Sequence, residues 1–229
     1  RDGRLADRFD LVVPSLAGYG FSEAPGREGF TFVDNGEILV KLVRRLGYAR
    51  FLVQGGDYGS LVGTAMCQLH PTECAGLHVN FPIAVPSNPL AWAFLWAHPA
   101  GARGNAYPVA DFFARILAAT GYYHEQATKP DTIGAVLHNN PVGLCAWIVE
   151  KFHAWSDHED DEAFEKLFDF DELLDNVMVY LVSGTATSAA RWYYASSHSF
   201  DRAVVSTRAR VVVPVGISDF PGEIFRPPR

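Results

Sequence analysis

The chain has 229 residues, of which 48% are hydrophobic and 20% are charged, so its composition is globular and argues against a disordered chain. With 19 Lys and Arg against 26 Asp and Glu, the net charge is −7. The composition therefore lacks the excess of positive charge that is typical of proteins that bind nucleic acid or anionic membranes. No apolar run approaches the roughly 18 residues that span a bilayer, and we expect no signal peptide because the first residues are charged.

Residues 1–88 alternate short strand patterns with helical patterns, which predicts the first part of an α/β core. The β-branched run at residues 11–13 predicts a buried strand, and a Gly-rich loop follows at residues 17–22. Apolar positions spaced along one helix face predict a helix over 34–46, which Gly47 ends. Residues 51–53 and 78–81 predict two further strands, with a helix over 60–69 between them. This order indicates a parallel sheet with crossover helices.

The three cysteines are too few and too scattered for a disulfide framework or a zinc site. We expect Cys67, Cys74 and Cys145 to be free thiols in a reducing compartment, and hence a cytoplasmic protein.

Residues 89–200 are rich in aromatic residues and helical periodicity, which predicts a helical cap inserted into the core. The helical patterns cover residues 109–119, 144–154, 161–168 and 171–181. Residues 201–229 predict a return to the core, with a strand at 210–217 and Pro214 near its end. The fold class expected is therefore α/β, with a parallel sheet as the core and a helical cap that interrupts it.

A run of acidic residues lies between positions 157 and 175. We interpret it as a solvated face with negative charges at helix N-termini. A calcium site is the alternative, but the D-x-D-x-D-G loop pattern is missing. The acids are Asp157, Glu159, Asp160, Asp161, Glu162, Glu165, Asp169, Asp171, Glu172 and Asp175.

The strongest local signal is FLVQGGDYGS at residues 51–60, which has the layout of a nucleophile elbow between a strand and a helix. Gly55 and Gly59 flank the central Asp57, where side chains would clash in a sharp turn. The turn presents Asp57 at the carboxyl end of the sheet, where ligands bind in open α/β folds. The alternative is that Asp57 only caps the following helix.

An aspartate at this position favours substitution at saturated carbon. A carboxylate is ionised at neutral pH and can attack an sp³ carbon, forming an alkyl ester that water can hydrolyse afterwards. The nearby helix N-terminus also favours the anion. The elbow therefore predicts a reaction on epoxides or alkyl halides.

The sequence resembles the microsomal-type epoxide hydrolases of the α/β-hydrolase superfamily over nearly its whole length. The matching segments are VVPSLAGYGFSEAP, QGGDYGSLVGTAMCQLHP, GLHVNFP, GYYHEQATKPDTIGAVLHNNPVGLCAWIVEKFHAW, FDELLDNVMVYLVSGTATSAARWYY and VVVPVGISDFPGEI. The resemblance implies Asp57 as the nucleophile and Tyr122 and Tyr193 as hydrogen-bond donors to the epoxide oxygen. It also implies Glu223, in an F-P-x-E segment, as the acid that orients a catalytic His.

Neutral phenols suit the donor role, because a tyrosine with its ordinary pKa near 10 keeps its proton at pH 7. Aromatic packing is the alternative role for Tyr122 and Tyr193, and the adjacent Tyr123 and Tyr194 leave the assignment within each pair open. Glu223 could instead be a surface carboxylate at a helix start, and Asp219 is a nearby competitor.

The resemblance also implies an H-G-x-P oxyanion loop before the first strand and a catalytic His after Glu223, and this sequence contains neither. We therefore expect an internal fragment of a longer enzyme, unstable or prone to aggregation alone, with the backbone N–H of Tyr58 as the oxyanion donor. His124 is interpreted as a packing residue, and His153 and His158 beside acids complete no metal-ligand set. The His residues are at positions 70, 78, 98, 124, 138, 153, 158 and 198.

The expected reaction opens an epoxide to a diol through an Asp57 ester, without cofactor or metal. The alternatives are a haloalkane dehalogenase-like hydrolase and a catalytically inactive module. A dehalogenase is expected to have a halide-binding Trp beside the nucleophile, whereas the residue after Asp57 is Tyr58. The expected partner is an apolar small-molecule epoxide, with no nucleic acid, no indicated membrane association and an open oligomeric state. An aromatic cap suggests an apolar pocket, although cap core is the alternative. Its members are Trp92, Trp96, Phe112, Phe113, Trp147, Trp155 and Trp192.

Overall fold

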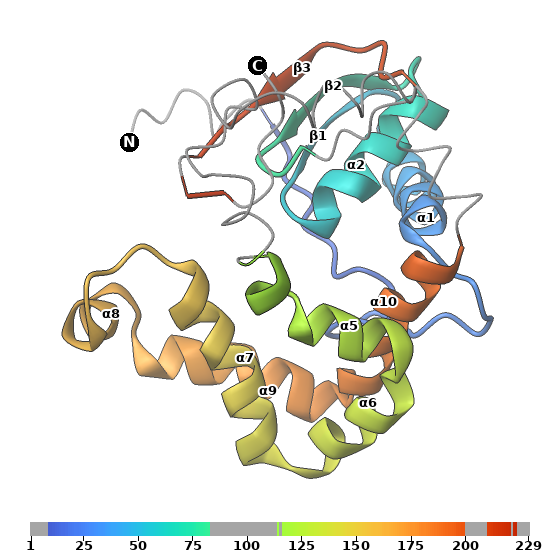
Figure 1. The fold of residues 1–229 in the computed structure, drawn as a ribbon. Coiled ribbons are helices and arrows are strands. Elements are labelled where there is room, and N and C mark those ends of the chain that lie inside the picture. Colours follow the sequence, from blue (N-terminus) through green and yellow to red (C-terminus); the bar gives the residue numbers. More distant parts are fainter. Residues whose placement is uncertain (1–8, 83–113, 115, 200–209, 221, 224–229) are drawn as a thin grey trace.

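The computed structural model describes residues 9–82, 114, 116–199, 210–220, 222 and 223 (Figure 1). Its sheet contains β1 (Phe51–Gly55), β2 (Cys74–Val79) and β3 (Val215–Ile217), all parallel and in the order β1-β2-β3. Leu77 of the central strand pairs with Val53 on one side and Val215 on the other. Because the strands are parallel, the residues that follow each of them meet at one edge of the sheet. The predicted parallel sheet is confirmed.

Two helices accompany this sheet. Helix α1 (Phe32–Arg45) begins at a capping box, in which Thr31 and Asp34 satisfy each other's backbone N–H groups. Helix α2 (Tyr58–Leu69) follows β1 directly. Buried side chains of both helices, including Val40 and Met66, form the core of this part of the molecule. The helices predicted at 34–46 and 60–69 are therefore confirmed within two residues.

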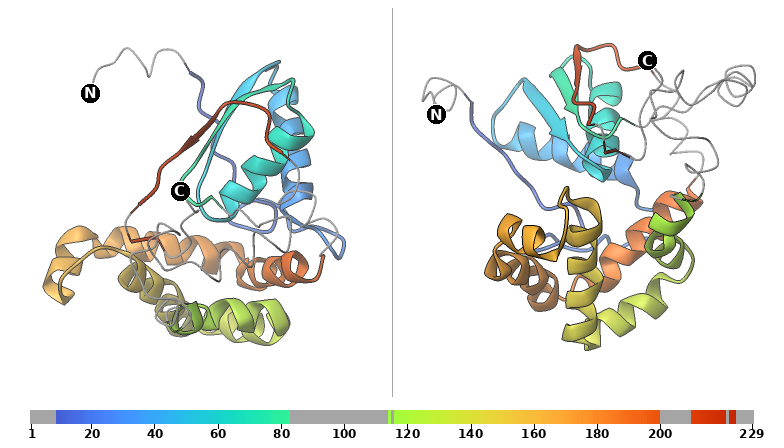
Figure 2. Two further views of the ribbon diagram at one scale, coloured as in Figure 1. Left: turned by 45° about the horizontal axis from the view of Figure 1, so that its top comes forward. Right: turned by 60° about the vertical axis from the view of Figure 1, so that its left-hand side comes forward.

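Six further helices form a layer on one side of the sheet and its helices (Figures 1 and 2). Their own core contains Leu137, Leu144, Val177 and Ala186. Trp192 reaches from this layer into the core between α1 and α2, so the two parts share one packed interior. In chain order the six are α5 (Gly121–Thr128), α6 (Pro130–Asn139), α7 (Pro141–Trp155), α8 (Asp161–Leu167), α9 (Phe170–Ser183) and α10 (Ala186–His198).

Several predicted elements differ from the structure. Residues 11–13 form no strand, and Leu11 and Val13 are exposed, because no described strand lies beside them to complete a hydrogen-bond ladder. Strand β2 begins four residues earlier than predicted, and β3 begins only after Pro214, whose ring nitrogen cannot donate to the ladder. The helix predicted at 109–119 and the boundaries at 88/89 and 200/201 lie largely or wholly outside the described residues.

The expectation of three free thiols is wrong for two of them. Cys67 near the end of α2 and Cys74 at the start of β2 form a disulfide, whereas Cys145 is free. Both bonded cysteines are buried in one hydrophobic cluster with Leu77 and Val79. The two cysteines are only seven positions apart in the sequence, and they meet because the chain reverses direction between α2 and β2.

The acidic run contains helix caps, as predicted. Asp160 accepts a hydrogen bond from the Ala163 N–H at the start of α8, and Asp169 accepts one from the Asp171 N–H at the start of α9.

Among the described helices, none has the length and apolar character needed to cross a bilayer.

Candidate active site

The turn between β1 and α2 has the geometry of a strained elbow. Asp57 has φ 48° and ψ −126°, and no other described residue except glycine has a positive φ. A Cβ on Gly55 would overlap the carbonyl group of Gly59, so Gly55 is required by a close backbone approach. The Ser60 hydroxyl donates to the Gly55 carbonyl at 2.9 Å and tightens the turn. Among the residues that the structure describes, a Cβ on Gly59 would meet nothing within 4 Å, so the clash predicted at that second glycine is not found there.

Asp57 does not act as a cap, because its side chain makes no capping hydrogen bond to α2. The residue keeps an exposed surface although protein surrounds it on several sides. Partial desolvation raises the pKa of Asp57 above its ordinary value, while a hydrogen bond from the Tyr58 N–H lowers it. The turn therefore presents a carboxylate that solvent or a ligand can reach.

Tyr122 on α5 and Tyr193 on α10 lie on the cap side of the elbow, where the ring of Tyr193 packs on that of Tyr58, the residue after Asp57, at 5.1 Å. Their rings meet edge to face, with centroids 5.9 Å apart. Burial raises the pKa of Tyr122 to about 12, and the charge of Asp57 adds to the increase. Burial also raises the pKa of Tyr193, to which neighbouring tyrosines and Asp57 contribute. Both phenols are neutral at physiological pH and lie within the electrostatic reach of Asp57.

The adjacent tyrosines have other surroundings. The Tyr123 hydroxyl is hydrogen-bonded to the Ser197 hydroxyl at 2.7 Å. Tyr194 is exposed and stacks on His198, with ring centroids 4.1 Å apart. In the part of the chain that the structure describes, no hydrogen bond involves the hydroxyl of Tyr122 or Tyr193. Both hydroxyls therefore remain free to bind a ligand in the cavity that Tyr122 and Tyr193 line.

A cavity of about 430 Å³ lies between the cap helices and is lined by both Tyr122 and Tyr193. Most of its wall is aromatic or aliphatic, with Trp147 and Trp155 from α7 among the lining residues, which fits an apolar ligand. Asp57 is not a lining residue, but its charge influences two tyrosines that are. Of the aromatic residues predicted for a pocket, Trp192 is buried in the core, and Trp92, Trp96, Phe112 and Phe113 lie outside the described residues.

Tyr19 and Lys151 are two of the lining residues that were not recognised from the sequence. Tyr19 lies in the Gly-rich loop between Gly18 and Gly20, both with positive φ, and its hydroxyl donates to the Ala189 carbonyl at 3.3 Å. The two flanking glycines were a signal that this tyrosine is held in a special turn. Lys151 on α7 also lines the cavity, and no sequence motif distinguished it from other helical lysines.

The candidate acids lie in the loop after β3, at the same sheet edge as Asp57. Glu223 is half-buried, and its N–H donates to the Phe220 carbonyl at 3.2 Å, whereas Asp219 is exposed. Position at the sheet edge suits either residue for orienting a base, so the choice between them stays a prediction.

Three of the described histidines each contact a neighbouring side chain. His78 on β2 lies 3.0 Å from the Ser218 hydroxyl, and His124 packs against the Tyr123 ring at 5.8 Å. His153 pairs with Asp161 at 3.0 Å. Within the described ranges, no three His, Cys, Asp or Glu side chains gather as a potential metal site.

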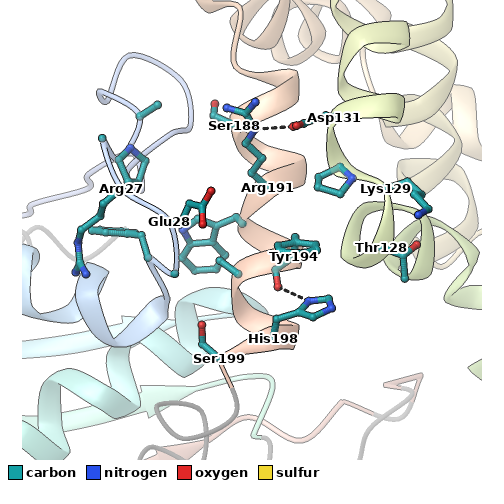
Figure 3. A pocket seen from close by; sticks show the side chains of 18 of the residues that line it. Arg27, Glu28, Thr128, Lys129, Asp131, Ser188, Arg191, Tyr194, His198 and Ser199 are labelled. Carbon is teal, nitrogen blue, oxygen red and sulfur yellow. Dashed lines mark hydrogen bonds and ion pairs between the residues drawn. The ribbon is translucent and has the colours of Figure 1, made fainter.

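A second cavity, of about 770 Å³, lies on another face of α10 (Figure 3). Its wall includes the loop at 24–30, the α5–α6 junction and α10, where Arg191 donates to Asp131 at 2.6 Å. None of Asp57, Tyr122 and Tyr193 lines it. Helix α10 therefore separates this polar cavity from the one that contains the two phenols.

Comparison with known proteins points to one family. A family described as the alpha/beta hydrolase fold matches residues 4–201. Epoxide hydrolase 1 of Sus scrofa is 38% identical over 231 residues, covering 96% of this chain and 51% of that protein. Juvenile hormone epoxide hydrolase 2 of Ctenocephalides felis is 39% identical over 228 residues, covering 94% of this chain and 49% of that protein. The chain thus spans about half the length of the curated relatives it matches.

Solved structures agree with this relationship. The crystal structure of juvenile hormone epoxide hydrolase from the silkworm Bombyx mori aligns with a TM-score of 0.84 and 34% identity, covering 94% of this chain and 53% of that one. The Aspergillus niger epoxide hydrolase aligns with a TM-score of 0.70 and 27% identity, covering 94% of this chain and 52% of that one. The fold is therefore shared across most of the present chain.

Proposed function

The chain belongs to the alpha/beta hydrolase family, and from this membership we propose that it is the catalytic part of an epoxide hydrolase in which Asp57 attacks the epoxide carbon. Tyr122 and Tyr193 donate hydrogen bonds to the epoxide oxygen. The observation that carries the proposal is an exposed carboxylate on the elbow whose next residue, Tyr58, packs against the ring of Tyr193, which in turn packs against the ring of Tyr122. The names of the relatives support epoxides as the substrate class.

The first step transfers negative charge from Asp57 to the donors. An Asp57 oxygen forms a bond to a ring carbon while the carbon–oxygen bond of the ring breaks. The released oxygen takes a proton from a tyrosine hydroxyl, so the products are a neutral ester, an alcohol and a phenolate. Because Asp57 helps to hold the pKa of Tyr122 at about 12, neutralising Asp57 makes Tyr122 a stronger acid as the ring opens.

The second step requires a base that activates water against the ester carbonyl. The resemblance assigns that base to a His oriented by Glu223, and no residue assigned in this chain supplies it. We therefore expect the 229-residue chain to form the ester once and to retain it. The backbone N–H of Tyr58, already directed at Asp57, is the proposed oxyanion donor for hydrolysis.

The test is mass spectrometry of the chain after incubation with styrene oxide. We expect one adduct with the mass of the intact epoxide, mapped to Asp57. Asp57→Asn removes the nucleophile and abolishes the adduct, whereas Asp131→Asn, which removes an exposed carboxylate paired with Arg191, leaves it unchanged. Adducts spread over surface carboxylates, or an adduct that survives Asp57→Asn, contradict the proposal. Preferential ester formation from 1-bromobutane, with release of bromide, favours dehalogenase chemistry instead.

A further inference from the structure

Lys151 lies against the face of a proposed proton donor. Its Nζ is 4.9 Å from the ring centroid of Tyr122 and 5.3 Å from that of Trp155. The two rings themselves meet edge to face at 5.3 Å. An ammonium within about 6 Å of a ring centroid is attracted by the negative face of the ring. Lys151 thus lies over the ring of Tyr122 with its ammonium group.

We propose that Lys151 is a positioning residue for epoxide opening, whose ammonium stabilises the negative charge that Tyr122 acquires when it gives up its proton. The inference rests on the proposed function of Asp57 and Tyr122. It assigns no bond making or breaking to Lys151 itself, and no contact between Lys151 and the substrate is required.

The direction of charge movement makes this position effective. Before reaction the negative charge is on Asp57, and after ring opening it is on the donor phenol. A cation beside the phenol therefore interacts more strongly with the product of this step than with its reactant, which is the condition for accelerating it. Among the described residues that line the cavity, Lys151 is the one with a permanent charge.

The surroundings of Lys151 preserve its field in the direction of Tyr122. The neighbouring Glu150 carboxylate pairs with Nζ at 2.5 Å and weakens the field. However, the Glu150 side chain is 57% exposed and that of Lys151 only 24%, so water screens the carboxylate more than the ammonium. Because Nζ lies over the rings of Tyr122 and Trp155, the part of its charge that Glu150 does not compensate acts on these two rings.

A packing role is the competing explanation, since Lys151 also joins α7 to the ring of Tyr122 on α5. The two roles predict a different dependence of the rate loss on the basicity of the oxygen that is released when the epoxide opens. Help with protonation matters most for an epoxide that opens to a strongly basic alkoxide and less for one whose alkoxide is stabilised by fluorine. Loss of packing slows the two substrates equally.

The experiment measures the rate of Asp57 ester formation with 1,2-epoxybutane and with 3,3,3-trifluoro-1,2-epoxypropane. Lys151→Met keeps the aliphatic stem and removes the charge. We expect its maximal rate with epoxybutane to fall about 3- to 30-fold, the range of a partly desolvated cation–π contact. We expect an unchanged half-saturating concentration and a clearly smaller decrease with the trifluoro epoxide. Lys151→Arg restores most of the rate because guanidinium retains the charge over the ring.

Two further variants complete the test. Lys166→Met removes a lysine that pairs with Glu162 on α8 outside the cavity, and it leaves both rates unchanged. Glu150→Gln removes the counter-ion of Lys151 and is expected to raise the rate with epoxybutane. This variant tests the inference independently if Lys151→Met does not fold. Equal slowing with both epoxides, an unaffected Lys151→Met, or no gain in Glu150→Gln overturns the inference. If the unmodified chain forms no Asp57 ester, the proposed function itself fails.

Discussion

The phenol ring of Tyr122 on α5 meets that of Tyr193 on α10 edge to face at 5.9 Å, and both line one apolar cavity. Tyr193 also packs edge to face on Tyr58, with centroids 5.1 Å apart, beside Asp57. The three aromatic side chains connect the cap helices to the elbow. The relative positions of carboxylate and phenols thus depend on packed rings and not on a flexible loop.

The two tyrosine pairs provide matched tests of the donor assignment. We expect Tyr122→Phe and Tyr193→Phe each to slow ester formation on Asp57 about 10- to 100-fold, because each removes one hydrogen bond to a developing alkoxide. Single-turnover mass spectrometry measures the rate. Tyr123→Phe loses the bond to Ser197 and about 1 kcal/mol of stability, with the rate retained. A rate loss in Tyr123→Phe or Tyr194→Phe equal to that of its neighbour would reverse the assignment.

Asp57→Asn should increase the free energy of unfolding at pH 7 by a few tenths of a kcal/mol up to about 1 kcal/mol, because the desolvated charge disappears and solvent screens the rest. Asparagine also tolerates a positive φ. The folded-state pKa of Asp57 is raised, so the wild-type penalty is present above that pKa. It disappears as the pH falls to the unfolded value of about 3.9. Urea unfolding of both proteins from pH 7 to pH 3.5 checks this convergence.

The elbow glycines are predicted to respond in opposite ways. Gly55→Ala places a Cβ on the Gly59 carbonyl and should destabilise the fold by about 3 kcal/mol or more, since both groups are backbone and cannot move aside. Gly59→Ala places its Cβ in open space within the first turn of α2 and should gain up to about 1 kcal/mol from helix propensity. Thermal unfolding of the two variants compares them. Similar losses in both would contradict the close approach at Gly55.

The cysteine pairing has a direct chemical test. Under denaturing conditions without reductant, iodoacetamide should label Cys145 alone, and after reduction it should label all three cysteines. Cys145→Ser should then take no label before reduction. Opening the short loop between Cys67 and Cys74 should lower the free energy of unfolding by about 2.5 kcal/mol in the chain-entropy treatment. Three labels before reduction would show that the thiols are free.

Local sequence predicted the position of the elbow well, because its strand, its glycines and its carboxylate are consecutive. Tertiary information was needed elsewhere. Adjacent tyrosines on a helix point in directions about 100° apart, and only packing determines that Tyr122 and Tyr193 face the cavity. The run at 11–13 has strand composition but no described partner strand.

Helix α6 and single lysines were beyond the sequence patterns. Helix α6 begins with Pro130, whose place at the first helical position is favourable but resembles a loop signal, whereas α7, which begins with Pro141, was predicted over 144–154. Lys151 became distinguishable only when the rings of Tyr122 and Trp155 were seen on either side of its ammonium. Trp155 is four residues after Lys151 on α7, a spacing that places the two side chains side by side, but Tyr122 lies on another helix and only the fold brings it to Lys151.

Asp57 and the two tyrosines proposed as its partners belong to different layers of the molecule, the first at a sheet edge and the others on helices packed over it (Figure 2). Substitutions along α7 or α9 can reshape the aromatic chamber while leaving the glycine turn untouched. Substrate preference can consequently change between related proteins while the elbow stays the same. A library of variants with exchanged cap helices is therefore a practical route to new selectivity.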